Sequence, residues 1–92
     1  MQMERVKGRQ RGEIILYALS TCGWCAKTRN LLDEIGVEYS YTYVDRLPPA
    51  EMEGAIREVE KYNPSGSFPT LVIDGSRAIV GFREAEIREA LK

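Results

Sequence analysis

Two cysteines, Cys22 and Cys25, are the residues of this 92-residue chain whose type and spacing indicate chemistry. The chain has no histidine, which excludes Cys/His zinc sites and histidine-based acid–base or nucleophile pairs. A separation of three positions does not suit a disulfide that joins distant segments, but it suits redox chemistry or metal binding. A Cys₄ zinc site needs a second such pair, which the sequence lacks. We therefore favour thiol–disulfide exchange over a metal half-site.

The position of the two cysteines along the chain predicts which sulfur attacks. The apolar stretch Glu13–Ala18 is typical of a strand buried on both faces, and an amphipathic helix is expected from Cys22 to about Ile35. Free N–H groups and the helix dipole favour a thiolate at the start of this helix, where Cys22 lies. Cys25 follows one turn later, within reach of the first sulfur. We expect Cys22 to attack a disulfide and Cys25 to resolve the mixed disulfide.

Hydrophobic periodicity predicts an alternation of strands and helices along the rest of the chain. In chain order, the expected elements are a strand over Val37–Asp45, a helix that opens at Pro48-Pro49 and ends at Asn63-Pro64, a hairpin of strands Thr70–Ile73 and Ala78–Gly81, and a helix over Arg83–Leu91. The first two strands, joined by a helix, should be parallel. The order βαβαββα predicts an α/β fold with a single domain.

The charge of the chain is concentrated in its first residues, although the formal net charge is only −1. Four basic residues face a single acidic one within residues 1–12. Such a stretch either contacts nucleic acid or a membrane, or is solvated. No aromatic residue interleaves these charges, so we expect a flexible extension before one domain over residues 13–92. The stretch also lacks the apolar middle of a secretory signal, and we expect the protein in the cytoplasm.

Four parts of the sequence together carry a family resemblance: Tyr17–Cys25 around the two cysteines, Gly36-Val37 with Val44-Asp45, Phe68–Ile73, and Val80-Gly81-Phe82. They resemble the glutaredoxin family, and the similarity extends over roughly residues 13–92. The resemblance implies a thioredoxin-like fold, a four-stranded mixed sheet flanked by three helices. It also implies a cis peptide bond before Pro69, which would face Cys22. The alternative for Pro69 is a proline that merely begins a strand, where its missing N–H costs no ladder bond.

The same resemblance implies a substrate-binding surface around the cysteines. Its expected residues are Thr21, Gly23, Trp24, Phe68, Pro69, Gly81 and Phe82. Gly23 should let the substrate backbone come close, since glycine has no side chain, and Trp24 should provide an apolar wall. Tyr39, Tyr41 and Tyr43 alternate along the second strand, which we interpret as sheet packing. We expect Lys27 and Arg29 to be solvated.

Two departures from the family pattern bear on the electron donor. Leu19 occupies the place where glutathione-using members carry a lysine, and Gly81-Phe82-Arg83-Glu84 replaces a double glycine followed by acidic residues. Losing a cationic contact weakens the case for anionic glutathione. Gly-Phe-Arg instead resembles the turn in glutaredoxin-like hydrogen donors of ribonucleotide reductase, which take electrons from a thioredoxin reductase-type enzyme. We expect an external thiol or such a reductase as donor, and no bound cofactor or metal.

The resulting prediction is a glutaredoxin-like protein-disulfide reductase that acts as a monomer on protein or small-molecule disulfides, without nucleic acid or membrane partners. Gly23 stands where many members have proline, and some members without that proline bridge a [2Fe–2S] cluster between two subunits. A cluster carrier that uses Cys22 and an external thiol is therefore the alternative, although Cys25 would compete for the exposed sulfur. A peptide-binding module without redox turnover is a third hypothesis, which the presence of both cysteines disfavours.

Overall fold

The computed structural model of the protein describes residues 3–92, and its elements confirm the α/β fold. In chain order they are β1 (Glu4–Val6), β2 (Ile14–Ala18), α1 (Gly23–Ile35), β3 (Tyr39–Tyr43), the 3₁₀ turn η1 (Val44–Arg46), α2 (Pro49–Tyr62), β4 (Thr70–Ile73), β5 (Arg77–Val80) and α3 (Glu84–Leu91). Within the described residues, no helix combines the length and apolar character that a membrane crossing requires.

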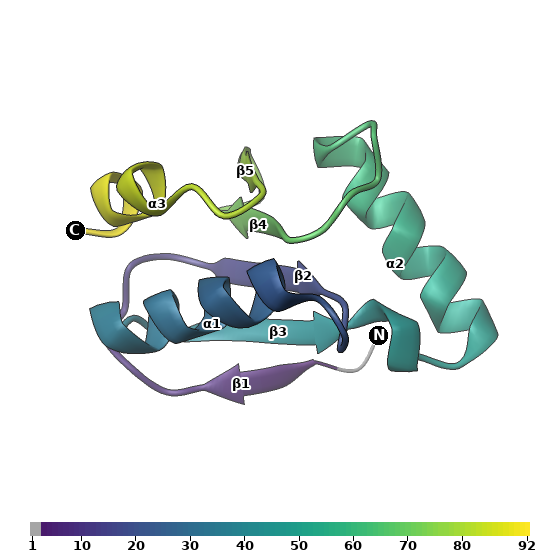
Figure 1. The fold of residues 1–92 in the computed structure, drawn as a ribbon, viewed down its shortest axis with the longest axis horizontal. Coiled ribbons are helices and arrows are strands. Elements are labelled where there is room, and N and C mark those ends of the chain that lie inside the picture. Colours follow the sequence, from purple (N-terminus) through teal and green to yellow (C-terminus); the bar gives the residue numbers. More distant parts are fainter. Residues whose placement is uncertain (1–2) are drawn as a thin grey trace.

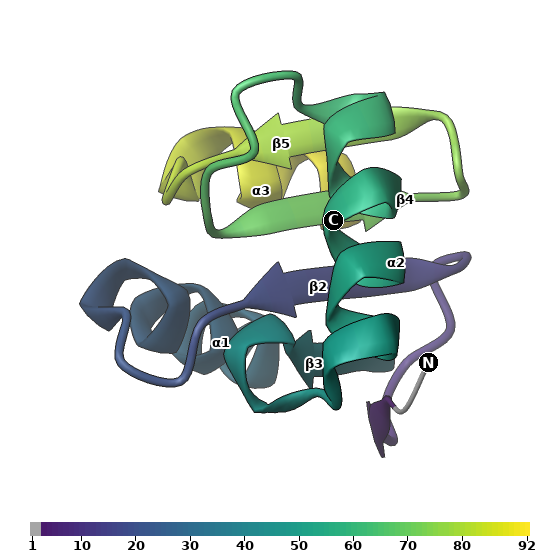
Figure 2. The same cartoon turned by 90° about the vertical axis from the view of Figure 1, so that its right-hand side faces the viewer.

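The five strands form one mixed sheet in the order β1-β3-β2-β4-β5. Strands β2 and β3 run parallel, as expected for a βαβ unit, and the other neighbouring strands are antiparallel. Helix α2 covers one face of the sheet, and α1 and α3 cover the other (Figures 1 and 2). In Figure 2 the sheet is seen from the side that α2 covers.

The sheet has five strands rather than the expected four, because β1 lies within the stretch expected to be a flexible extension. Strand β1 pairs antiparallel with β3. The carboxylate of Glu38 accepts hydrogen bonds from Arg5 Nε at 3.0 Å and from Gln10 Nε2 at 2.9 Å. A β-bridge between Arg9 and Val37 continues this contact. Some of the charges in this stretch thus bind the sheet edge, while its first two residues lie outside the described part of the chain.

Side-chain alternation along the central strands divides the core into two clusters. On β2, Leu16 packs with residues of α1 and α3, whereas Tyr17 packs with Ala55 and Val59 of α2. Leu16, Ala55 and Val59 are fully buried. Strand β2 is therefore buried on both faces, which explains its continuous apolar sequence.

The second strand of the βαβ unit ends earlier than expected. Strand β3 stops at Tyr43, and Val44–Arg46 form η1 instead of extending the strand to Asp45. Val44 turns into the cluster under α2, where it is 2% exposed. The turn leaves Asp45 exposed beyond the end of β3.

Replacing Leu16 by alanine should lower the free energy of unfolding by about 2–5 kcal/mol, because it leaves a cavity at the centre of the sheet. Urea denaturation followed by circular dichroism measures the change. Arg57, an exposed residue of α2, offers a control, since Arg57→Ala should change stability by no more than about 0.5 kcal/mol. Equal effects of the two substitutions would contradict the assignment of Leu16 to the core.

Candidate active site

Cys22 is the N-cap of α1, as expected from its place between a strand and a helix. Its backbone is extended, with φ −93° and ψ 115°, and its sulfur accepts a hydrogen bond from the backbone N–H of Cys25. The N···Sγ distance is 3.2 Å. The carbonyl of Cys22 accepts the N–H of Ala26 at 3.1 Å and so begins the helix. The sulfur of Cys22 therefore occupies the place of a capping acceptor, where N–H groups and the helix dipole favour negative charge.

The two cysteines differ in exposure in the way that their expected roles require. Cys22 is partly exposed, whereas Cys25 is 1% exposed and belongs to the core cluster beneath α1 and α3. Helix periodicity explains the difference, because Cys25, Thr28 and the pair Leu31-Leu32 share the buried stripe of α1. A substrate can reach the first sulfur, and the second lies behind it.

Burial raises the pKa of the Cys25 thiol to about 12. The hydrogen bond and charge of Cys22 act in the same direction, as does the carboxylate of Asp45, while a backbone hydrogen bond at Leu19 opposes them. Desolvation disfavours the thiolate because an apolar environment solvates charge poorly. At neutral pH Cys25 is accordingly a thiol.

A shallow groove of about 250 Å³ gathers most of the expected substrate-binding residues. Its lining consists of Trp24, Phe68, Pro69, Gly81 and Phe82. The register of the strands explains why these residues meet. Tyr17 of β2 pairs with Thr70, the first residue of β4. Pro69, which precedes Thr70, therefore lies just beyond this end of the ladder, next to the loop after β2. The N–H of Gly81 donates to the carbonyl of Pro69 at 2.9 Å. The Phe68–Pro69 bond is cis, as the resemblance implied.

An aromatic pair connects the cysteine motif with the turn after β5. The rings of Trp24 and Phe82 stack with centroids 5.8 Å apart and an interplanar angle of 24°. The ammonium group of Lys27 lies 5.3 Å from the centroid of Trp24. Trp24 is nevertheless 59% exposed. The exposed ring of Trp24 thus forms, with Phe82, an aromatic surface next to the cysteine motif.

The two remaining expected residues, Thr21 and Gly23, do not line this groove. Both are exposed at the start of α1. A Cβ atom at Gly23 would meet nothing within 4 Å. The glycine is therefore not required by packing, but it leaves one approach to Cys22 uncovered.

Sequence reasoning missed a pair of residues that supports the loop before Cys22. The backbone N–H of Ser20 donates to Asp45 Oδ1 at 2.9 Å, and the Ser20 hydroxyl donates to Asp45 Oδ2 at 2.5 Å. These hydrogen bonds lower the pKa of Asp45. The parallel pairing of β2 and β3 could have indicated this contact. Ala18 pairs with Tyr43, and Ser20 and Asp45 each lie two residues beyond these partners.

Arg29 is partly buried rather than free in solvent, contrary to expectation. Its guanidinium carbon lies 3.8 Å from the centroid of the Tyr41 ring, and its nitrogens donate to the hydroxyls of Tyr39 and Tyr43 at 3.3 and 3.1 Å. The Tyr39 hydroxyl in turn donates to Asp33 at 2.8 Å. The alternating tyrosines of β3 therefore hold α1 against the sheet, which agrees with their interpretation as packing residues.

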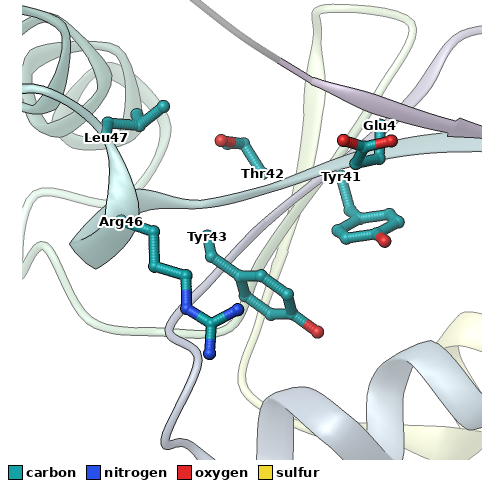
Figure 3. A pocket seen from close by; sticks show the side chains of 6 residues that line it. All are labelled: Glu4, Tyr41, Thr42, Tyr43, Arg46 and Leu47. Atoms are coloured by element: carbon teal, nitrogen blue, oxygen red, sulfur yellow. The ribbon is translucent and has the colours of Figure 1, made fainter.

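A second hollow, of about 290 Å³, opens beside the end of β3 (Figure 3). It is lined by Glu4, Tyr41, Thr42, Tyr43, Arg46 and Leu47. The guanidinium carbon of Arg46 lies 5.4 Å from the Tyr43 ring centroid, and Figure 3 shows the two side chains next to each other. This lining contains neither cysteine, so we assign the candidate active site to the groove beside α1.

The raised pKa of Cys25 predicts selective alkylation. Iodoacetamide reacts with thiolates, and Cys25 stays protonated until the pH approaches about 12. At pH 8, Cys22 should be modified more than about tenfold faster than Cys25, as peptide mapping by mass spectrometry will measure. In a Cys22→Ser variant the remaining thiol should react slowly at pH 8 and faster at each higher pH. Rapid labelling of Cys25 in the native protein at pH 8 would contradict this assignment.

The chain is similar to known proteins in both sequence and structure. The family model described as Glutaredoxin matches residues 14–78, which is more than half of the chain. The glutaredoxin from Methanosarcina mazei Go1 is 53% identical, with 99% of this chain and 88% of that one covered and a TM-score of 0.92. The methanoredoxin of Methanosarcina acetivorans is 51% identical, with 91% and 88% covered and a TM-score of 0.90.

A more distant relative is the uncharacterized glutaredoxin-like 8.6 kDa protein in the rubredoxin operon of Clostridium pasteurianum. It is 29% identical over 80 residues, which cover 86% of this chain and 97% of that protein. The fold is thioredoxin-like, and it supports a thiol–disulfide oxidoreductase role for the neighbouring cysteines. On the match over residues 14–78 and the similarity of these structures, the chain belongs to the glutaredoxin family.

Proposed function

We propose that the protein is a dithiol oxidoreductase that reduces disulfides of proteins or small molecules through its Cys-Gly-Trp-Cys motif. The observation that carries the proposal is the arrangement of the two sulfurs. Cys22 is partly exposed at the start of α1 and accepts the N–H of Cys25 at 3.2 Å, while the Cys25 thiol is buried behind it. This arrangement supports attack by Cys22 and resolution by Cys25.

In the first step the Cys22 thiolate attacks one sulfur of the substrate disulfide. A bond forms between Cys22 and that sulfur, the substrate S–S bond breaks, and the other substrate sulfur leaves as a thiolate that takes a proton from solvent. The Cys25 sulfur then attacks Cys22, giving the Cys22–Cys25 disulfide and releasing the second substrate thiol, while the proton of Cys25 goes to that leaving group or to solvent. Two electrons pass from the protein dithiol to the substrate.

The apolar groove supports binding of a substrate beside the attacking sulfur. Trp24 and Phe82 offer stacked rings, and Phe68 and Pro69 also line the groove. Apolar and aromatic surface can bury part of a substrate that carries a disulfide, with a few backbone groups to orient it. Because the groove is open, we propose that it accepts segments of proteins as well as small disulfides.

Two electrons from outside the protein must reduce the Cys22–Cys25 disulfide after each turnover. We propose an external thiol or a thioredoxin reductase-type enzyme as the donor. Glutathione is disfavoured because Leu19 stands where glutathione-using relatives carry a lysine, and because Gly81-Phe82-Arg83-Glu84 replaces their double glycine followed by acidic residues. The protein thiols themselves carry the electrons, so the proposed cycle needs no bound cofactor and only a monomer. A reducing cytoplasm would keep the pair in its dithiol form.

Replacing Cys22 by serine should abolish reduction of hydroxyethyl disulfide by the protein in the presence of dithiothreitol, since no attacking sulfur remains. Cys25→Ser should keep the first step and so leave a mixed disulfide that only external thiol can resolve. Turnover would then fall and depend more steeply on thiol concentration. Thr28→Ser, at a buried position one turn later on α1, serves as a control for the packing of the helix. Wild-type turnover by Cys22→Ser would refute the proposed reaction.

The departures from the glutathione-using pattern predict a preference among electron donors. With hydroxyethyl disulfide as the common substrate, turnover supported by dithiothreitol or a thioredoxin reductase should exceed turnover supported by glutathione at equal reducing equivalents. A Leu19→Lys variant should narrow the difference, because it restores a cation near the site for an anionic thiol. High turnover of the native protein with glutathione alone would overturn the donor assignment.

A further inference from the structure

We propose that Asp45 is a positioning residue of the redox site: its carboxylate holds the loop that carries Cys22 and places a negative charge near Cys25. The inference rests on the proposed function of the two cysteines but concerns a residue outside the motif. Asp45 lies in η1, 20 residues beyond Cys25 in the sequence.

The parallel pairing of β2 and β3 brings Asp45 to the site. Ala18 at the end of β2 pairs with Tyr43 at the end of β3. Ser20 lies two residues after Ala18, and Asp45 lies two residues after Tyr43, so the parallel pairing brings Ser20 and Asp45 side by side. Because parallel strands end at the same edge of a sheet, the segment after β3 lies beside the loop after β2, and Asp45 is the residue of η1 that contacts this loop. The group that meets the loop is therefore a carboxylate.

Both carboxylate oxygens of Asp45 are used by one residue of the loop. Oδ1 accepts the backbone N–H of Ser20 at 2.9 Å, and Oδ2 accepts the Ser20 hydroxyl at 2.5 Å. The loop also contains a turn, in which the N–H of Cys22 donates to the carbonyl of Leu19 at 3.2 Å. Four residues separate the end of β2 from the start of α1. The contact of Ser20 with Asp45 and the turn from Leu19 to Cys22 together fix their path. The hydrogen bonds to Asp45 are charge-assisted and stronger than neutral ones.

The charge of Asp45 also acts on Cys25. Burial is the largest cause of the raised pKa of Cys25, and the carboxylate of Asp45 acts in the same direction. The hydrogen bonds from Ser20 keep Asp45 ionised by lowering its own pKa. Because a nearby anion destabilises a thiolate, Asp45 should help to keep Cys25 protonated while its hydrogen bonds hold the loop before Cys22.

Three variants separate these two effects. Asp45→Asn removes the charge but keeps an acceptor oxygen for the Ser20 N–H. Ser20→Ala keeps the charge but removes the hydroxyl bond, and Asp45→Ala removes both. Glu53→Gln is the matched control, because Glu53 lies on α2 with 75% of its side chain exposed, and its substitution changes the net charge by the same amount as Asp45→Asn.

The first measurement is the rate at which iodoacetamide alkylates Cys25 in a Cys22→Ser background at pH 9. Asp45→Asn and Asp45→Ala should raise this rate by about threefold, because removing one charge several ångströms away through water-like surroundings favours the Cys25 thiolate by that factor. Ser20→Ala and Glu53→Gln should match the parent protein. A purely structural role would not make the rate depend on the charge at position 45, so an unchanged rate in Asp45→Asn would overturn the proposal.

The second measurement is the rate at which iodoacetamide alkylates Cys22 in a Cys25→Ser background. Losing the hydroxyl bond in Ser20→Ala should slow the reaction by up to about fivefold, and Asp45→Ala, which removes both hydrogen bonds, should slow it at least as much. Equal rates in Ser20→Ala and the parent protein would contradict the positioning role. Neither measurement needs substrate turnover. A wild-type protein that fails to reduce hydroxyethyl disulfide would refute the proposed function, while these two results would still decide the role of Asp45.

Discussion

The hydrogen bond from the Cys25 N–H to the sulfur of Cys22 is the contact on which the site depends. It makes one cysteine the N-cap of α1 and places the other inside the first turn of the same helix. A single local geometry thus exposes one sulfur to solvent and to the positive end of the helix, and buries the other in the core. The chemical difference between two identical side chains follows from where the helix begins.

The sheet fixes that starting point. Strand β2 is buried on both faces and ends at Ala18, between β3 and β4. Phe68 and Pro69, which line the groove, come directly before β4. Asp45, which binds Ser20 in the loop before Cys22, lies in η1, directly after β3. Neighbouring strands therefore supply the two sides of the site. A slip of either register would move these groups away from the cysteines, so sheet pairing and reactivity are coupled.

The parts of this arrangement that local pattern determines could be predicted from the sequence. The continuous apolar run of β2, the helix start at Cys22 and the helix end at Gly36 each have a strong local signal. Strand β1 has none, because three residues with two charges at a sheet edge show no periodicity. The contacts of Ser20 and Arg29 depend on which strands pair and which helix face meets β3. Such contacts appear only when the elements are assembled.

The most direct test of the central claim is the capture of a mixed disulfide with an aromatic disulfide reagent, quantified by intact mass in two single-cysteine variants at pH 7. Cys25→Ser should form the adduct rapidly through Cys22, since that sulfur is exposed at the helix start. Cys22→Ser should form little of it in the same time, since Cys25 is buried and protonated. Comparable or faster capture by Cys22→Ser would contradict the division of roles between the two sulfurs.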